Sequence, residues 1–228
     1  MPDLPERVEI AEEGPREGFQ IEPGPIPTAD KVALIDALAD TGLRHIQICS
    51  FVNPRLVPGW ADAEAVAGSF SPREGVHYTA LWFNESGLSR ALAFRDRLHL
   101  FGSISLSASD AFSRKNLNRG HAENLEAMRK QTAAHQAAGV PVTRLGVTKF
   151  DSTVGGLGGC PFAGQKGAAG NICTEELALL CEEMGIATGI DLDALIEVGR
   201  MAERIVGHPL PSELLRAGSL DAFRRKAA

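Results

Sequence analysis

The stretch "RVEIAEEGPREGFQIEPGPIPTADKVALIDALADTGLRHIQICSF", residues 7 to 51, decides the fold. The strand-like "RVEIAEE" precedes Val32, Ile35 and Leu38, which recur at helical spacing up to Gly42, and the strand-like "HIQICSF" follows. A strand, a helix and a second strand in this order predict a βαβ unit with parallel strands. The stretch therefore predicts an α/β fold.

The same alternation continues along the chain. "HYTALWF" (77–83) and "RLHLFGSISLSA" (97–108) read as strands, separated by a short helix after Glu85. A long helix then runs to Gly139, and "VPVTRLGVTKFDSTVGG" (140–156) has strand-like residues without room for another helix. Two helices close the chain, at 175–184 and at 192–206, the second with Asp191 as its N-cap. We expect a single domain over residues 1–228.

Composition limits the classes of partner. The chain has 228 residues, 44% of them hydrophobic, and a formal net charge of -6 without a cationic stretch, so we expect no nucleic-acid partner. No apolar run is long enough to span a membrane, so we expect no membrane partner. The four cysteines show no CxxC spacing, and the first residues lack the pattern of a signal peptide. We therefore expect a cytoplasmic protein with free thiols.

Four unusual segments follow the predicted strands. They are "GPREGFQ" (14–20), "SFVNPRLVPG" (50–59), "SASDAFSRKNLN" (107–118) and "GGLGGCPFAGQKGAAGN" (155–171). In parallel βα units the loops at the carboxyl ends of the strands lie on one face, so we expect these four loops to form an active site. The glycine-rich run has few side chains, so its backbone either bends sharply or lets another molecule lie against its amides.

In this order, "GPREGFQ", "SFVNPRLVPG", "RKNLN" and "GGLGGCPFAGQKGAAGNICTEEL" resemble the hydroxymethylglutaryl-CoA lyases over nearly the whole chain. The resemblance implies a (β/α)8 TIM-barrel domain of the pyruvate carboxyltransferase-like type. It also implies retro-Claisen cleavage of the acyl-CoA substrate 3-hydroxy-3-methylglutaryl-CoA to acetyl-CoA and acetoacetate, with Mg²⁺ or Mn²⁺. A divalent cation would stabilise the charge that develops on the substrate oxygens.

The resemblance also implies roles for individual residues. Arg16 matches a catalytic arginine that polarises the substrate oxygens, and Cys160 matches a catalytic cysteine that assists proton transfer to the enolate. Glu17 stands where many members have an aspartate metal ligand, and Gln47 where many have glutamate. The remaining matches are Asn171 as a second metal ligand and Gln20, Lys115 and Asn116 as candidate substrate-binding residues. We interpret Cys49, Cys173 and Cys181 as inert core thiols.

The chain departs from the family in one place. "AGVPVTR" matches the start of the fifth barrel strand, and the following "LGVTKFDSTVGGLGG" matches the end of the seventh helix and the eighth strand. About two to three βα units are therefore missing, together with a His-x-His pair of metal ligands. We expect a shortened, unclosed barrel with weak metal binding and doubtful cleavage activity, and an open sheet edge that favours a homo-oligomer. The alternatives are a sister lyase for a related thioester such as citramalyl-CoA, or a non-catalytic remnant that binds acyl-CoA or pairs with a complete subunit.

Overall fold

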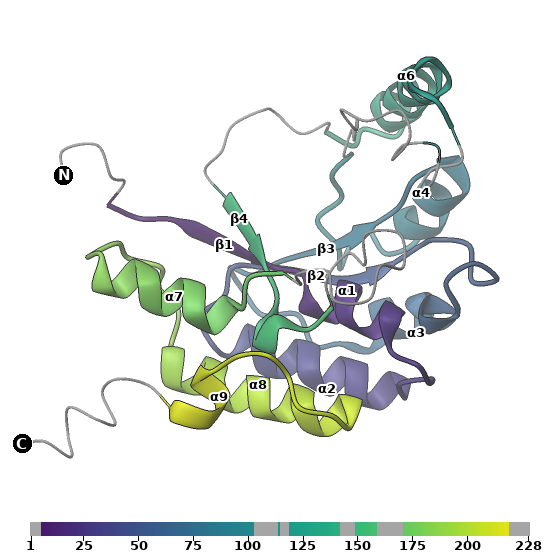
Figure 1. The fold of residues 1–228 in the computed structure, drawn as a ribbon. Coiled ribbons are helices and arrows are strands. Elements are labelled where there is room, and N and C mark those ends of the chain that lie inside the picture. The colour runs from purple at the N-terminus through teal and green to yellow at the C-terminus, as the bar shows by residue number, and fades with distance from the viewer. Residues whose placement is uncertain (1–5, 103–113, 115–118, 142–148, 159–170, 219–228) are drawn as a thin grey trace, which may run out of the picture.

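The computed structural model describes residues 6–102, 114, 119–141, 149–158 and 171–218. Four strands form its sheet: β1 (Glu9–Glu12), β2 (His45–Ser50), β3 (His77–Leu81) and β4 (Lys149–Ser152). All pairs are parallel, in the order β3-β2-β1-β4, so β4 lies beside β1 although more than half the chain separates them (Figure 1). The predicted α/β class with parallel strands is confirmed.

Helices connect and cover these strands. After β1 come α1 (Gly14–Ile21) and α2 (Thr28–Ala39), and after β2 come the 3₁₀ turn η1 (Pro58–Trp60) and α3 (Ala63–Ser69). Then follow α4 (Glu85–Leu92), α6 (His121–Ala137), η2 (Val154–Gly156), α7 (Thr174–Glu183), α8 (Leu192–Val206) and α9 (Leu214–Ala217). Figure 1 shows α2, α7 and α8 on one side of the sheet, and α4 and α6 beyond β3.

The two faces of the sheet differ in polarity because side chains alternate along each strand. On β2, Ile46 and Ile48 are fully buried toward the helices, whereas His45 and Gln47 are only partly buried. On β3, Tyr78 is buried in the same apolar layer, which continues into α2 and α8. The core therefore lies between the sheet and its helices, and the other face carries polar side chains.

Residues 140–156, where the chain departs from the family, lie near both edges of the sheet. Beyond β3, the His99 amide donates to the carbonyl of Tyr78 over 2.7 Å, and the Gly102 amide donates to the carbonyl of Pro141 over 2.8 Å. At the other end, β4 pairs with β1 from Glu9–Lys149 to Glu12–Ser152. The described parts of residues 140–156 thus contribute to two places; residues 142–148 lie outside the described residues.

One local prediction was wrong. "GPREGFQ" forms the helix α1 and not a loop. Pro15 fits the first helical turn, where its missing N–H would be unpaired in any case, and Phe19 packs on the fully buried Trp60. Arg16 and Glu17 therefore lie on a helix, where the backbone is regular. The helices expected at 175–184 and 192–206 are observed at Thr174–Glu183 and Leu192–Val206, and the Asp191 carboxylate accepts the Ala194 amide at 3.0 Å.

Within the described residues, no helix combines the length and the apolar character that crossing a membrane requires.

Candidate functional site

Arg16 lies at the centre of a polar cluster at the carboxyl ends of β1 and β2. Its Nη1 donates to Glu17 Oε1 at 2.9 Å, its Nη2 donates to Glu13 and its Nε donates to Gln47. The Arg16 backbone carbonyl accepts a hydrogen bond from Trp60 Nε1 at 2.9 Å. Arg16 is only 8% exposed, so these contacts fix the guanidinium in one position.

Glu17 connects this cluster to the far end of the glycine-rich run. Its Oε1 is bound by Arg16, and its Oε2 accepts a hydrogen bond from Asn171 Nδ2. The near end of the run also touches α1, because a Cβ on Gly158 would lie 2.9 Å from the Gly18 nitrogen and 3.0 Å from the Glu17 carbonyl carbon. Gly158 has φ +81, which favours glycine. The described ends of the glycine-rich segment therefore meet α1 where Arg16 and Glu17 lie.

Glu13 is a member of the cluster that the sequence did not single out. It is the N-cap position of α1, and its carboxylate accepts from Arg16. Burial raises the pKa of Glu13 above its usual value, Arg16 opposes this shift, and the charges of Asp151 and Glu17 add to it. In the sequence, Glu13 belongs to an acidic pair directly before "GPREGFQ". Such a pair is typical of the solvated end of a strand, so it did not indicate a site residue.

Two buried carboxyl groups hold the turn from which the glycine-rich run starts. Glu12 Oε1 accepts from the amides of Gly14 at 2.7 Å and Val154 at 2.8 Å, and its Oε2 accepts from Thr174 Oγ1 at 2.5 Å. Both carboxylate oxygens of Glu175 accept from the Gly155 amide, at 2.8 and 2.9 Å. Burial raises the pKa of Glu12 to about 7 and that of Glu175 to about 8. These groups therefore anchor η2 between β1 and α7.

The other predicted residues are placed as follows. Gln20 is half-buried on α1, and its side chain makes no hydrogen bond to another described residue. Cys160, Lys115 and Asn116 lie outside the described residues. The remaining cysteines are free thiols whose pKa is raised by burial; Cys49 and Cys181 lie in the core, whereas Cys173 is only partly buried.

The histidine side chains that the structure describes make contacts with residues other than Glu17. The rings of His45, His77 and His99 lie in a row across β2, β3 and the segment beyond, tilted against one another, with centroids 4.9 and 4.3 Å apart. His135 on α6 accepts from Trp82 Nε1 at 2.8 Å and donates from Nδ1 to a backbone carbonyl at 2.6 Å, which defines a neutral ring. His208 pairs with Glu22 at the surface.

A divalent metal ion does not fit the donor set at Glu17. Hard cations require several oxygen ligands, and both Glu17 oxygens are already bound, one by Arg16 and one by Asn171. Over the described ranges, no group of three or more His, Cys, Asp or Glu side chains could hold a metal ion. No chemical step is therefore assigned to a metal ion.

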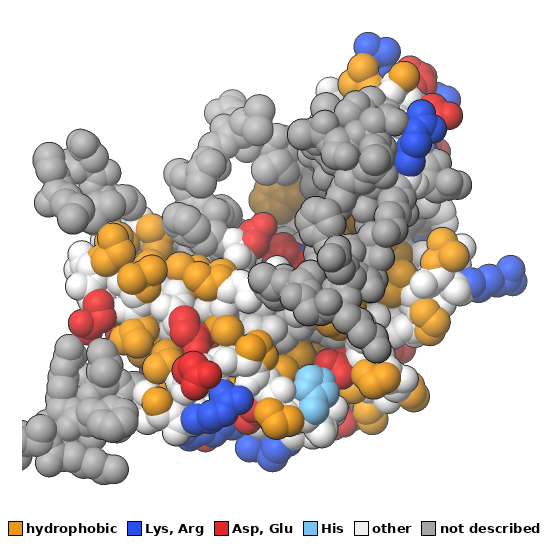
Figure 2. All heavy atoms as spheres, in the orientation of Figure 1, with side chains coloured by type: hydrophobic (Ala, Val, Ile, Leu, Met, Phe, Trp, Pro, Cys, Tyr) orange, Lys and Arg blue, Asp and Glu red, His pale blue; other side chains and the backbone are white. Residues whose placement is uncertain are grey.

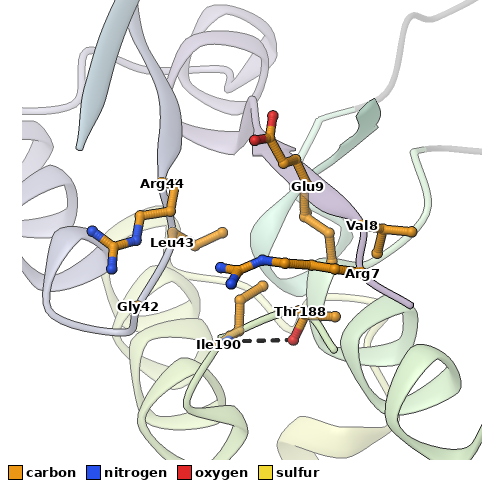
Figure 3. Close-up of a pocket in the computed structure, with 9 residues that line it drawn as sticks. Arg7, Val8, Glu9, Gly42, Leu43, Arg44, Thr188 and Ile190 are labelled. Atoms are coloured by element: carbon orange, nitrogen blue, oxygen red, sulfur yellow. Dashed lines mark hydrogen bonds between the residues drawn. The ribbon is translucent and has the colours of Figure 1, made fainter. Parts of the chain in front are cut away.

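Figure 2 shows acidic side chains in a hollow above the middle of the sheet, on the face that carries the cluster. A pocket of about 90 Å³ lies at the amino ends of β1 and β2. In Figure 3 the Arg7 side chain extends across it toward the turn at Gly42, while the carboxylate of Glu9 points away. In folds of this type the active site lies at the carboxyl ends of the parallel strands, whereas the amino ends contribute to stability. The candidate active site is therefore the Arg16 cluster.

Comparison with curated proteins identifies the relatives of the chain. Hydroxymethylglutaryl-CoA lyase YngG of Bacillus subtilis is 29% identical over 93% of this chain and 97% of its own length. A 3-hydroxy-3-isohexenylglutaryl-CoA/hydroxymethylglutaryl-CoA lyase of Pseudomonas aeruginosa is 28% identical over 94% of this chain and 98% of its own. The YngG alignment has 301 positions, more than the 228 residues here, so YngG carries residues that this chain lacks. No model of a known protein family matches the chain.

Solved structures of hydroxymethylglutaryl-CoA lyases also superpose on this chain. The hydroxymethylglutaryl-CoA lyase of Bacillus subtilis superposes with a TM-score of 0.83 at 27% identity, over 95% of this chain and 99% of that one. A hydroxymethylglutaryl-CoA lyase of Acinetobacter baumannii, solved with coenzyme A and 3-methylmalate, gives 0.77 at 26% identity, over 96% and 97%. The resemblance predicted from the motifs is confirmed, and the fold is a TIM-barrel type shortened relative to the complete barrel.

Proposed function

Because its curated relatives and structural neighbours are hydroxymethylglutaryl-CoA lyases, we propose that this chain binds 3-hydroxy-3-methylglutaryl-CoA and cleaves it slowly to acetyl-CoA and acetoacetate. The observation that carries the proposal is the fixed guanidinium of Arg16, which is held by Glu13, Glu17 and Gln47 at the carboxyl end of the sheet. A positive group that is held in place before the reaction stabilises developing negative charge without reorganisation.

The cleavage follows from the chemistry of a tertiary alcohol beside a thioester. A carboxylate takes the proton of the C3 hydroxyl, and Glu13 and Glu17 supply carboxylates beside Arg16. The oxygen lone pair forms the ketone of acetoacetate while the C2–C3 bond breaks, and the electron pair of that bond forms the acetyl-CoA enolate. Arg16 stabilises the enolate oxygen. By the family resemblance, Cys160 then assists in protonating the enolate carbon.

The rate would be far below that of a complete barrel. In a lyase that uses a divalent ion, the ion supplies charge stabilisation at the substrate oxygens, and the donor set described around Glu17 does not fit such an ion. Arg16 is then the main electrophile in the described part of the site. A sister substrate of the same class, such as citramalyl-CoA, would use the same groups.

The same observation favours a second function, binding of acyl-CoA without cleavage. A protein that has lost metal ligands but keeps Arg16 and the glycine-rich segment can still hold a thioester. Mass-spectrometric detection of acetoacetate and acetyl-CoA, together with calorimetric binding of coenzyme A, separates the two functions. Product that depends on Arg16 supports cleavage, and binding without product supports the second function.

A further inference from the structure

The pocket at the amino ends of β1 and β2 lies at the other end of the strands from Arg16 (Figure 3). Its lining comes from three parts of the chain that are far apart in the sequence, residues 7–10, residues 42–44 and the segment 188–190 before α8. A water molecule takes about 30 Å³ of the liquid, so a pocket of about 90 Å³ suits an ion of a few heavy atoms. It is too small for a drug-sized ligand, whose site usually exceeds about 300 Å³.

Backbone hydrogen bonds fix these three parts to one another. The Val8 amide donates to the carbonyl of Ala187 over 3.1 Å, which joins the start of β1 to the segment before α8. The Asp191 amide donates to the carbonyl of Thr41 over 2.7 Å, which joins the same segment to the turn before β2. The walls of the pocket are therefore held by the backbone.

Two arginines border the pocket and keep donors for an anionic ligand. The Arg7 guanidinium makes no hydrogen bond or ion pair with another described residue. Arg44 makes one hydrogen bond within the described ranges, to the carbonyl of Gly75 at 3.3 Å. A guanidinium has five N–H donors in a planar fork that matches the oxygens of phosphate. Most of the donors of Arg7 and Arg44 are thus available.

A buried hydroxyl and a turn without side chains complete the pocket. Thr188 is only 7% exposed; its Oγ1 accepts from the Ile190 amide at 3.2 Å and makes no other hydrogen bond to a described residue, so its O–H can donate to a ligand. A Cβ on Gly189 would lie 3.0 Å from Arg7 Nη2, and a Cβ on Gly42 would lie 2.4 Å from the Gly189 carbonyl oxygen. Both glycines have positive φ, +76 and +89, so a side chain is disfavoured where Arg7 crosses the pocket.

The acidic residue of the lining is directed elsewhere. Figure 3 shows the Glu9 carboxylate pointing away from the pocket, and it lies 3.2 Å from His45 Nε2. Its negative charge is therefore turned away from the guanidinium groups of Arg7 and Arg44. Two positive side chains then set the field in the pocket, and this field attracts an anion.

We infer that this pocket binds a small tetrahedral oxyanion, namely inorganic phosphate or the phosphate group of a small ester. Arg7 and Arg44 bind its oxygens from two sides, and Thr188 donates its hydroxyl proton. The bound ion bridges three parts of the chain that meet only in the folded protein, so it stabilises the native state. The site is separate from the Arg16 cluster and does not depend on the proposed cleavage.

Calorimetric titration of the full chain with inorganic phosphate, at an ionic strength held constant with chloride, tests the site. We expect saturable binding with a Kd on the order of millimolar, because both arginines are exposed to water. Arg7→Gln and Thr188→Val should each weaken it about tenfold, the size of one lost hydrogen bond to a charged group. Titration with glycerol 3-phosphate distinguishes the free ion from the phosphate of an ester, and tighter binding of either one supports the site.

Arg204→Gln is the matched control. Like Arg7, Arg204 is exposed and has no hydrogen bond or ion pair with a described residue, but it lies on α8 and does not line the pocket. Phosphate should bind this variant as tightly as the unaltered chain. Equal affinities of the Arg7 and Arg204 variants, or heats that chloride alone reproduces, overturn the inference. These measurements involve no cleavage, so either result leaves the proposed function to its own test.

Discussion

The side-chain amide of Asn171 donates a hydrogen bond to the carboxylate of Glu17, which joins residues 154 positions apart. Through the second oxygen of Glu17, Asn171 is also linked to the guanidinium of Arg16. Arg16 and Glu17 from the first motif and Asn171 from the glycine-rich run thus form one connected group.

Replacing Arg16 with lysine should lower the rate of cleavage and leave the fold intact. Lysine keeps the positive charge but loses the planar fork that engages Glu13, Glu17 and Gln47. We expect a fall in kcat of roughly 100-fold, the scale of one lost donor to a developing oxyanion. Steady-state kinetics measures it. Arg73→Lys is the control, because Arg73 is exposed and pairs with Asp40 away from the site. Equal rates for both variants would remove Arg16 from the mechanism.

Stability should fall as the pH rises from about 4.5 to about 8. The pKa values of Glu12 and Glu175 are raised in the folded protein, to about 7 and about 8, so the folded state keeps protons that the unfolded state has lost over this range. Their contribution is fully present below the unfolded pKa and is lost as the pH passes the folded pKa. Urea unfolding at pH 5.5, 7 and 8.5 measures this trend.

Glu12→Gln should flatten that pH dependence. The glutamine oxygen can still accept from the amides of Gly14 and Val154, and its amide nitrogen can face Thr174, so the fold should survive. The slope should decrease because one of the two groups no longer titrates. Glu74→Gln, at an exposed position, serves as control. An unchanged slope in the Glu12 variant would mean that Glu12 is ionised in the folded protein throughout.

Divalent metal ions should bind weakly. The described donor set at Glu17 has too few free oxygens, so we expect a Kd for Mn²⁺ on the order of millimolar. Calorimetric titration with Mn²⁺ measures it. Micromolar binding that is lost in Glu17→Gln would show that other residues have taken the place of the missing histidine pair.

The chain should self-associate. β4 is the last strand of the described sheet, and Ile172, Leu180 and Met184 are 48, 53 and 47% exposed at α7, where Figure 2 shows a row of hydrophobic side chains. Open sheet ends and exposed apolar patches both favour association. Light scattering after size exclusion measures the mass, and Leu180→Lys should reduce it. A monomer that unfolds cooperatively would contradict this expectation.

The order of strands and helices could be read from hydrophobic periodicity, because the apolar residues of β2 and α2 mark the faces that are buried. The sequence also singled out Arg16, Glu17 and Asn171 as candidates, and the structure places their side chains in contact. It did not reveal that "GPREGFQ" is helical, since a Gly-Pro pair reads equally as a turn until Phe19 packs on Trp60. Glu13 and the buried pair Glu12 and Glu175 were missed because charged residues are usually solvated, and only tertiary packing buries them.

Incubation of purified protein with (S)-3-hydroxy-3-methylglutaryl-CoA, followed by mass-spectrometric measurement of acetoacetate and acetyl-CoA, tests the proposed cleavage most directly. We expect slow, equimolar formation of both products by the unaltered chain and by Arg73→Lys, and a strong decrease with Arg16→Lys. No product above the protein-free control, from a folded protein that binds coenzyme A, would contradict cleavage and leave acyl-CoA binding as the function.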